Sequence, residues 1–295
     1  MATKNILHML SPLKHMSPFD VNMALDAGFD SVTPYSGVTL DDITPLVQDA
    51  MFSRSPRDAV RTGVFIGGKD ASLALEMMDR LRKTLLKPFE ISAFADPAGS
   101  FTTAAAIVAC VEKLLKQKKA KLLGQMKIVI FGATGPTGYT SGVIAAMEGA
   151  EVTLAARDAS KMKAKADEIK QKFGLDVHAV QSKTPEEISA ALAGKEIALC
   201  TAAAGVQVLS ETMLAAAKSL LVCADVNAVP PAGIEGLDLH ANGAELTGGS
   251  LGIGPLAIGD VKYKTESGLF QRMANSATAV SLDFRDAFAL AREIA

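Results

Sequence analysis

The chain has 295 residues, of which 49% are apolar, and its 30 Lys and Arg nearly balance its 32 Asp and Glu. This length and composition suffice for one large or two ordinary domains with a sizeable core. A formal net charge of −2 provides no global basic field for a nucleic-acid backbone or an anionic membrane. We therefore expect neither nucleic acid nor membrane among its partners.

The longest uncharged stretch, Ile128–Met147, is about as long as a bilayer span, and the mean hydropathy of the chain is +0.24. Gly132, Gly135, Pro136 and Gly138 interrupt the middle of this stretch. A lipid-facing backbone could not leave amides unpaired there. The stretch instead predicts a buried strand, a turn and a buried helix.

The amino-terminal segment Met1–Leu10 has no long apolar region of the kind found in secretory signals, which favours a cytoplasmic protein. Cys110, Cys200 and Cys223 are few, odd in number and set in apolar runs, so we expect buried, reduced thiols. The four histidines are scattered and no Cys-x-x-Cys occurs. The sequence therefore predicts no metal site.

Over the first hundred residues, short β-branched runs alternate with helical patterns, which is typical of a parallel sheet covered by helices. The expected strands are residues 5–10, 29–34, 63–68 and 90–95. Ser17 followed by Pro18 predicts a helix start, and Gly28 predicts the end of that helix. Apolar residues at four-residue steps predict another helix over residues 69–86, ended by Pro88.

The helical run of residues 102–122 changes from apolar to lysine-rich, and we predict a domain junction at its end. Such a basic cluster either contacts an anionic ligand or is a solvated helix end that matches the helix dipole. Its lysines are Lys113, Lys116, Lys118, Lys119 and Lys121.

The second half repeats the alternation of strand and helix more clearly. Strands are expected over residues 127–131, 151–155, 176–180, 196–200 and 219–225, with helices over 136–150, 159–173 and 184–194. Five strands with helical crossovers predict a doubly wound sheet. Thr184 with Glu187 forms a capping-box pattern. Beyond the sheet, Gly252, Gly254 and Gly259 predict either a flexible cover over a ligand or a turn.

We thus predict an α/β protein of two domains. Residues 1–120 form an α/β domain with a parallel sheet, and residues 121–260 form a doubly wound Rossmann domain. Residues 261–295 form C-terminal helices that return to the first domain.

The segment Gly132–Gly138 has the spacing G-x-x-G-x-x-G, follows an expected strand and opens an expected helix. A dinucleotide pyrophosphate needs backbone N–H donors at a helix start, and glycine where a side chain would block its approach. The context therefore predicts a dinucleotide site. Its first set of residues is Gly132, Ala133, Thr134, Gly135, Pro136, Thr137 and Gly138.

The second strand of this unit ends in Arg157, whose planar guanidinium suits the 2′-phosphate of NADP. Lys161 provides a possible second positive charge. Asp158 complicates the assignment, because a small shift of the strand end would aim a carboxylate at the ribose, as in NAD-selective enzymes. We predict NADP, with NAD as an alternative. Further cofactor-binding residues are expected in the loops after the fourth and fifth strands, namely Ala202, Ala203 and Asn227.

The motifs of several common mechanisms are absent. None of Tyr35, Tyr139 and Tyr263 has Lys four residues later, so the Tyr-x-x-x-Lys base of short-chain dehydrogenases does not occur. No G-x-S-x-G, H-E-x-x-H or Walker motif occurs either. A hydride donor whose cation is stabilised by its own nitrogen lone pairs needs no such base, which favours a substrate of that kind.

Several long and unusual strings carry a resemblance that spans nearly the whole chain. They are residues 6–10, 12–24, 61–69, 94–103 and 225–234. In these strings the chain resembles the NAD(P)-dependent methylene-tetrahydromethanopterin dehydrogenases of methylotrophic bacteria, whose architecture is similar to that of the methylene-tetrahydrofolate dehydrogenases. The resemblance implies oxidation of methylene-tetrahydromethanopterin, or of the tetrahydrofolate form, to the methenyl compound with NADP. It further implies that the first domain binds a tetrahydropterin and that the protein is a homo-oligomer.

Polar residues follow the expected strands of the first domain, at the edge of a parallel sheet where clefts form. The predicted substrate-binding residues are Lys14, His15, Tyr35, Asp96, Thr102 and Thr103. Catalytic residues are unknown, with Lys14, Asp96 and Lys262 as candidates. Structural alternatives exist: Asp96 shapes a turn, the threonines cap a helix, and Lys14 is solvated.

Two other functions stay open at this point. One is another two-domain NADP oxidoreductase resembling shikimate dehydrogenase, for which Lys14 and Asp96 would have to form a pair. The other is a nonenzymatic NADP-binding sensor, because G-A-T-G-P-T-G also resembles the loop of such regulators. In those regulators the loop usually lies at the amino terminus, whereas here a whole α/β domain precedes it.

Overall fold

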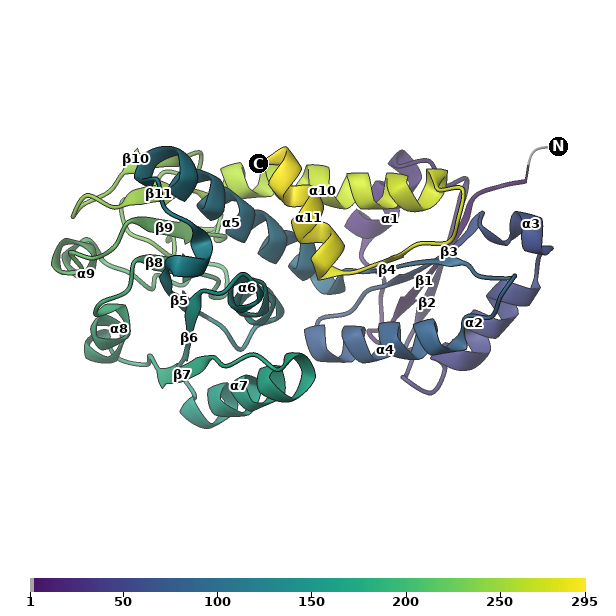
Figure 1. The fold of residues 1–295 in the computed structure, drawn as a ribbon, viewed down its shortest axis with the longest axis horizontal. Helices are drawn as coiled ribbons and strands as arrows, with labels where there is room; N and C mark the ends of the chain where they lie inside the picture. The colour runs from purple at the N-terminus through teal and green to yellow at the C-terminus, as the bar shows by residue number, and fades with distance from the viewer. Residues whose placement is uncertain (1–2) are drawn as a thin grey trace. The chain divides into compact units, whose positions relative to one another are not determined.

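A computed structural model describes residues 3–295 and shows an α/β protein with two largely parallel sheets (Figure 1). The chain divides into two compact units. The first contains Met1–Thr102 and Tyr263–Leu290, and the second contains Thr103–Lys262 and Ala291–Ala295. The predicted fold class is confirmed, while the predicted domain boundaries at residues 120 and 260 stay a prediction.

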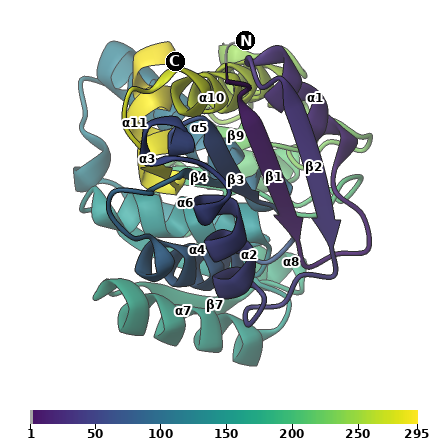
Figure 2. The ribbon, with the colours of Figure 1, turned by 90° about the vertical axis from the view of Figure 1, so that its right-hand side faces the viewer.

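The first unit contains a five-stranded parallel sheet. Its strands, in spatial order, are β12 (Ser281–Leu282), β4 (Ser92–Ala95), β3 (Thr62–Ile66), β1 (Ile6–Ser11) and β2 (Ser31–Ser36). Figure 2 shows β1 and β2 running in the same direction at one edge. The four strands expected from the sequence are confirmed. The fifth, β12, brings the C-terminal segment back to this sheet.

Helices cover both faces of this sheet (Figures 1 and 2). They are α1 (Pro18–Asp26), α2 (Ile43–Phe52), α3 (Pro56–Ala59) and α4 (Ala71–Thr84). On the face covered by α1 and α10 (Pro255–Asn275), the buried ring of Phe270 packs against Phe65 and Phe94, with centroids 5.2 Å away in each case. This aromatic cluster anchors α10 to the sheet.

The second unit contains a seven-stranded sheet. Its order is β10 (Asn242–Glu245), β11 (Leu251–Ile253), β9 (Val222–Asp225), β8 (Ile197–Cys200), β5 (Lys127–Phe131), β6 (Glu151–Ala156) and β7 (His178–Gln181). All neighbours are parallel except β10 with β11. The chain builds outward from β5 in both directions, so the strand order reverses there. This reversal is the switch point at which doubly wound sheets bind ligands.

Helices flank this sheet on two sides, with α6 (Pro136–Met147) and α7 (Ala159–Phe173) on one face and α8 (Pro185–Leu192) and α9 (Glu211–Ala216) on the other (Figure 1). Leu192 and Leu214 from α8 and α9 join Val129 and Phe131 of β5 in one buried core. On the opposite face, Gly142 of α6 lies directly over Leu154. The remaining α-helices of the described residues are α5 (Ser100–Leu114), which continues into a π-helical turn (Leu115–Lys119), and α11 (Phe284–Ile294). Two short 3-10 helices span Pro97–Gly99 and Leu123–Gln125.

The local helix signals are confirmed. Ser17 caps α1, Thr184 and Glu187 form the complete capping box of α8, and Gly174 ends α7 in the left-handed conformation at φ +71°. Capping thus fixes where several helices begin and end.

The expectation for the glycine-rich segment was wrong in both its forms. Gly252 lies in β11, where a Cβ would come within 2.6 Å of Leu237 Cδ1, and Gly254 packs against the carbonyl oxygens of Asp238 and Leu239. Gly259 lies inside α10, which starts at Pro255. The glycines instead lie in β11, at the junction that leads into α10, and in α10 itself, and at Gly252 and Gly254 they allow close packing.

The uncharged stretch Ile128–Met147 forms β5, a turn and α6, as predicted. A different segment, Pro97–Lys119, has the length and composition of a membrane-crossing helix. Its most apolar window is 78% buried within the protein, as in the core helix of a globular fold.

Candidate functional site

The turn between β5 and α6 requires glycine at two positions. Gly132 has φ +76°, and a Cβ there would lie 2.6 Å from the backbone nitrogen of Ala202. A Cβ on Gly138 would collide with Thr201 Oγ1 and with Ala133 Cα. Both glycines therefore let the turn pack directly against the loop that follows β8.

The N-terminus of α6 opens at this turn. Gly135 is its N-cap residue and Pro136 its first residue. The N–H groups of Thr137 and Gly138 lie in the first turn, where no intrahelical acceptor exists. Around Gly135 there is open room, since the nearest atom to a Cβ would be Gly132 O at 3.4 Å. The arrangement suits a phosphate group, which needs N–H donors and close access to the backbone.

A cavity of about 490 Å³ lies beside this turn, within the second unit. Seven of the predicted cofactor-binding residues line it: Gly132, Thr134, Gly135, Pro136, Arg157, Ala202 and Ala203. The structure thus brings together the glycine turn, the end of β6 and the loop after β8, as expected for the cleft of a doubly wound sheet.

The remaining predicted cofactor residues are placed differently. Ala133 is fully buried, and Thr137 and Gly138 lie in the first turn of α6. Lys161 is exposed, with its ammonium 4.0 Å from Asp158 Oδ2, and it does not line the cavity. The second basic residue that lines this cavity, beside Arg157, is Lys183.

Asp158 is the N-cap of α7. Its Oδ1 accepts hydrogen bonds from Lys161 N (3.0 Å) and Ser160 Oγ (2.7 Å), and these bonds lower the pKa of the carboxyl. The carboxylate is therefore engaged at the helix start. Arg157, one residue earlier, lines the cavity.

Several cavity residues were not predicted: Ser182, Lys183, Ile188, Val206, Gln207 and Val208. Ser182 and Lys183 directly follow β7, which pairs with β6. Since neighbouring parallel strands end at the same edge of a sheet, the position of Arg157 after β6 was a usable signal for this pair.

Asn227 was predicted to bind the cofactor, but its side chain is used by the protein itself. It is 5% exposed, and its Oδ1 accepts from the N–H groups of Gly205 (3.2 Å) and Val229 (2.9 Å). Its Nδ2 donates to Pro231 O over 2.9 Å. Asn227 therefore ties the loop after β9 to the loop after β8.

Asp225, the last residue of β9, also binds the loop that follows this strand. Its carboxylate accepts from Asn227 N (3.0 Å) and Gly233 N (2.7 Å). Burial raises the pKa of this carboxyl, and the backbone N–H donors oppose that rise. A network of buried and half-buried hydrogen bonds thus holds this loop.

On the substrate side, the structure brings Asp96 and Thr102 together. Both are fully buried, and Thr102 Oγ1 donates to Asp96 Oδ2 over 2.5 Å. Asp96 Oδ1 accepts from Phe101 N at 2.8 Å and from Thr102 N at 3.3 Å. This geometry corresponds to the structural alternative for Asp96, in which it shapes the turn that opens α5.

The other predicted substrate residues are not brought into this cluster. Lys14 and His15 are exposed in the loop after β1, and within residues 3–295 the structure gives Lys14 no ion pair. Thr103 on α5 and Lys262 on α10 are half-buried. Tyr35 is hydrogen-bonded to His8 Nδ1 at 3.0 Å, and both line a separate pocket of about 240 Å³ in the first unit.

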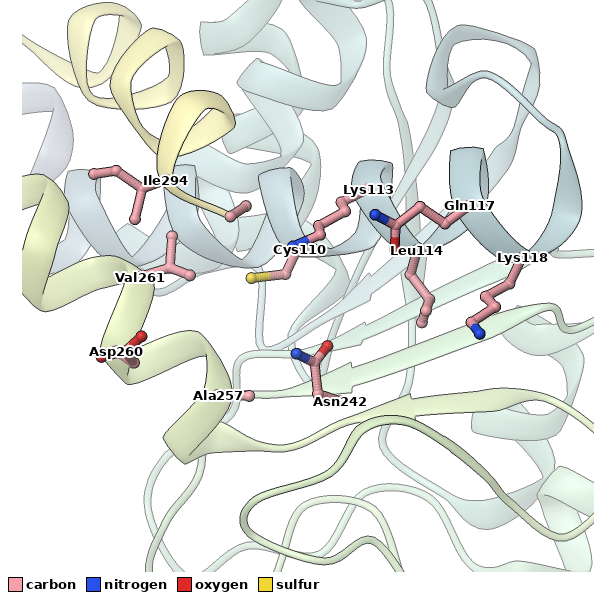
Figure 3. A pocket seen from close by; sticks show the side chains of 11 residues that line it. Cys110, Lys113, Leu114, Gln117, Lys118, Asn242, Ala257, Asp260, Val261 and Ile294 are labelled. Carbon is pink, nitrogen blue, oxygen red and sulfur yellow. The ribbon is translucent and has the colours of Figure 1, made fainter.

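A further pocket of about 320 Å³ lies along α5 in the second unit (Figure 3). Lys113 and Lys118 of the predicted basic cluster line it, together with Asn242 and Asp260. Cys110, expected to be buried, is half-buried in its wall, where burial raises the pKa of its thiol to about 11. Two other lysines of the cluster form ion pairs, Lys116 with Glu112 (3.1 Å) and Lys121 with Glu196 (2.9 Å).

Comparison with known proteins identifies the family. The sequence is 51% identical over 294 residues to the NAD(P)-dependent methylenetetrahydromethanopterin dehydrogenase of Methylorubrum extorquens, covering 99% of both chains. The chain belongs to this family. A family model described as "Methylene-tetrahydromethanopterin dehydrogenase, N-terminal" matches residues 18–98. The Bifunctional protein MdtA of the same organism is 32% identical and covers 99% of this chain and 100% of its own.

Solved structures show the same fold at low identity. Shikimate 5-dehydrogenase from Listeria monocytogenes is 14% identical, covers 92% of each chain and superposes with a TM-score of 0.52. Quinate dehydrogenase from Corynebacterium glutamicum is 12% identical, covers 97% of this chain and 98% of its own, and has the same TM-score. The chain thus shares its fold with these two dehydrogenases, whose solved structures contain NAD.

Membership in the methylenetetrahydromethanopterin dehydrogenase family disfavours the two alternative functions, the shikimate-dehydrogenase-like enzyme and the nonenzymatic sensor. The structure adds to this. Because Asp96 is enclosed and Lys14 has no ion pair within residues 3–295, the Lys–Asp pair of the shikimate-type alternative is not formed.

Proposed function

We propose that this protein oxidises methylene-tetrahydromethanopterin to the methenyl compound by transferring a hydride to NADP, with methylene-tetrahydrofolate as a further substrate. The observation that carries the proposal is the 51% identity to an NAD(P)-dependent methylenetetrahydromethanopterin dehydrogenase across 99% of both chains. The cavity beside the glycine turn supports it with the groups that a dinucleotide needs.

The residues of the second unit fit NADP. The open space around Gly135 accommodates the pyrophosphate, the N–H groups at the start of α6 donate hydrogen bonds to it, and Arg157 lines the same cavity. Ala202 and Ala203 line the cavity with small side chains, which let a ribose approach the backbone. When bound, NADP supplies the hydride acceptor, the nicotinamide ring.

The reaction needs little acid–base chemistry from the protein. The C–H bond of the methylene carbon breaks, its electron pair leaves with the hydrogen, and a neighbouring nitrogen lone pair forms the new C=N bond. The chain therefore has to orient the donor and exclude water. This agrees with the placement of Asp96, whose carboxylate is committed to the α5 turn.

We further propose that Lys14, His15, Tyr35 and Thr103 contact the tetrahydropterin, because each is exposed or half-buried. Lys14 and His15 follow β1, Tyr35 lies near the end of β2, and Thr103 lies on α5. Lys262, half-buried on α10, stays a candidate on the cofactor side. We also propose a homo-oligomer, which the family resemblance implies, and a cytoplasmic location, which the few cysteines in apolar runs favour.

The test is a set of four assays with purified protein: methylene-tetrahydromethanopterin and methylene-tetrahydrofolate, each with NADP and with NAD, followed by the absorbance of the reduced nicotinamide. We expect turnover with the methanopterin and NADP. No turnover with either pterin, from protein that still binds NADP, would refute the proposed reaction. Light scattering on the same preparation gives the oligomeric state.

A further inference from the structure

We propose that Lys183 is the second cation of the NADP site and that it determines, together with Arg157, the preference for a 2′-phosphate. The inference rests on the proposed function and deepens it. Arg157 follows β6 and Lys183 follows β7, so the phosphate is held from two neighbouring strands.

The first argument is position. In the β6–β7 pair, Ala156 lies opposite Gln181, and Ser182 N donates to Ala156 O over 2.8 Å. This bond extends the pairing to Ser182, one residue past the end of β7. Arg157 is the first residue after β6 and Lys183 the second after β7, so both follow neighbouring strands at the same edge of the sheet, and both line the 490 Å³ cavity.

The second argument is the availability of the charge. The side chain of Lys183 is exposed, and within residues 3–295 its ammonium has neither an ion pair nor a hydrogen bond. The nearby carboxylate of Glu187, on the first turn of α8, binds backbone N–H groups and not the Lys183 ammonium. Its Oε2 accepts hydrogen bonds from Lys183 N (2.6 Å) and Thr184 N (3.2 Å). The capping box thus fixes the backbone of Lys183 while its side chain stays free to reach a ligand.

The third argument is the comparison with Lys161, the residue that the sequence favoured for this role. Lys161 has its ammonium 4.0 Å from Asp158 and does not line the cavity. A guanidinium and an ammonium are complementary here, because the planar Arg fork fixes the orientation of a phosphate and Lys adds a mobile point charge. The structure offers Arg157 and Lys183 for these two tasks.

The experiment uses adenosine 2′,5′-bisphosphate and 5′-AMP as probes, which differ only in the 2′-phosphate, and measures their Kd by calorimetry. We expect Lys183→Met to weaken the bisphosphate by about 10-fold and 5′-AMP by less than about 2-fold. Lys183→Arg retains most of the affinity. The matched control, Lys161→Met, leaves both affinities unchanged, and thermal unfolding confirms that each variant is folded.

The contrary outcomes are distinct. If Lys183→Met changes the affinity for the bisphosphate by less than about 2-fold, or weakens both probes equally, Lys183 does not contact the 2′-phosphate and the proposed reaction is unaffected. If the wild-type protein itself does not prefer the bisphosphate to 5′-AMP, the NADP assignment fails and this inference fails with it. If Lys161→Met has the effect expected for Lys183→Met, the roles of the two lysines are reversed.

Discussion

Asn227 Oδ1 accepts a hydrogen bond from the backbone N–H of Gly205 over 3.2 Å and so joins the loop after β9 to the loop after β8. We predict that Asn227→Ala lowers the free energy of unfolding by about 1 to 3 kcal/mol, because three buried or half-buried backbone groups lose their partner. NADP affinity falls with it, since the loop of Ala202 and Ala203 loses its support. Thermal unfolding and NADP titration measure both effects. Val229→Ala, which shortens an exposed side chain of the same loop, is the control and should change neither.

The second prediction concerns the role of Arg157 in the choice between NADP and NAD. Arg157→Glu should weaken NADP by about 10- to 100-fold, because a charge-assisted pair is replaced by repulsion, while NAD loses much less. The ratio of kcat/KM for the two cofactors reports the difference. An equal loss for NADP and NAD would show that Arg157 does not hold the 2′-phosphate.

The glycine turn allows a paired test. Gly132→Ala should destabilise the protein by at least about 2 kcal/mol, because its φ is +76° and a Cβ would lie 2.6 Å from Ala202 N. Gly135→Ala should change stability by less than about 1 kcal/mol, since its φ is −75°, yet its methyl group enters the cavity and lowers dinucleotide affinity. Melting temperatures and NADP titration separate the two. Equal stability of both variants would contradict the geometry of the turn.

We predict that the Asp96 carboxylate contributes to the free energy of unfolding rather than to substrate binding. Asp96→Ala removes the acceptor of two backbone N–H groups and of Thr102 Oγ1, all buried, and should cost about 2 to 4 kcal/mol of unfolding free energy. A double-mutant cycle with Thr102→Val should give a coupling of about 1 kcal/mol or more. Unchanged stability in Asp96→Ala, with loss of activity alone, would instead assign the carboxylate to the substrate.

Glu112 provides a prediction of pH dependence. Burial alone raises the pKa of its carboxyl, but Arg292 (Nε at 2.7 Å, Nη2 at 2.9 Å) and Lys116 bring that pKa below the ordinary value. A lowered pKa in the folded state means that the carboxylate stabilises the protein above the ordinary pKa of about 4.3 and loses this effect as the pH falls through the lower folded value.

The comparison is between Glu112→Gln and the wild type. Their difference in unfolding free energy should be about 1 to 3 kcal/mol at neutral pH and should shrink below about pH 4. Asp167→Asn, which breaks an exposed pair with Lys163, is the control and should have almost no effect at any pH. A difference that is independent of pH would mean that the Glu112 charge does not contribute.

Much of this fold was predictable because local signals and tertiary structure agree. Residues 159–173 were expected to be helical and α7 spans Ala159–Phe173, since Asp158 caps its start and Gly174 ends it. β12 escaped prediction because two residues carry no periodicity and exist as a strand only through pairing with β4. The start of α10 was missed because the surrounding glycines obscured Pro255, a residue suited to the first helical position.

The candidate site was predictable where a backbone motif defines it. It was less predictable where a side chain has several possible hydrogen-bond or ion-pair partners. The glycine turn and Arg157 follow from strand, turn and spacing, and all lie at one cavity. Asp96 and Asn227 have side chains suited to ligands, but in the folded protein their oxygens accept hydrogen bonds from backbone N–H groups. Lys161 and Lys183 are both lysines that follow a strand of the second sheet. The pairing of β6 with β7 and the contact of Lys161 with Asp158 distinguish them, and neither can be read from the sequence.

The pairing of β12 with β4 has a consequence for how the chain is made. The sheet of the first unit includes residues 281–282, whereas the second unit is almost wholly contained in residues 103–262. On the ribosome, all of the later unit except Ala291–Ala295 is therefore synthesised before the earlier unit has its last strand, which reverses the usual order of domain completion. Until then β4 presents an open strand edge, whose unpaired N–H and C=O groups favour pairing with another chain.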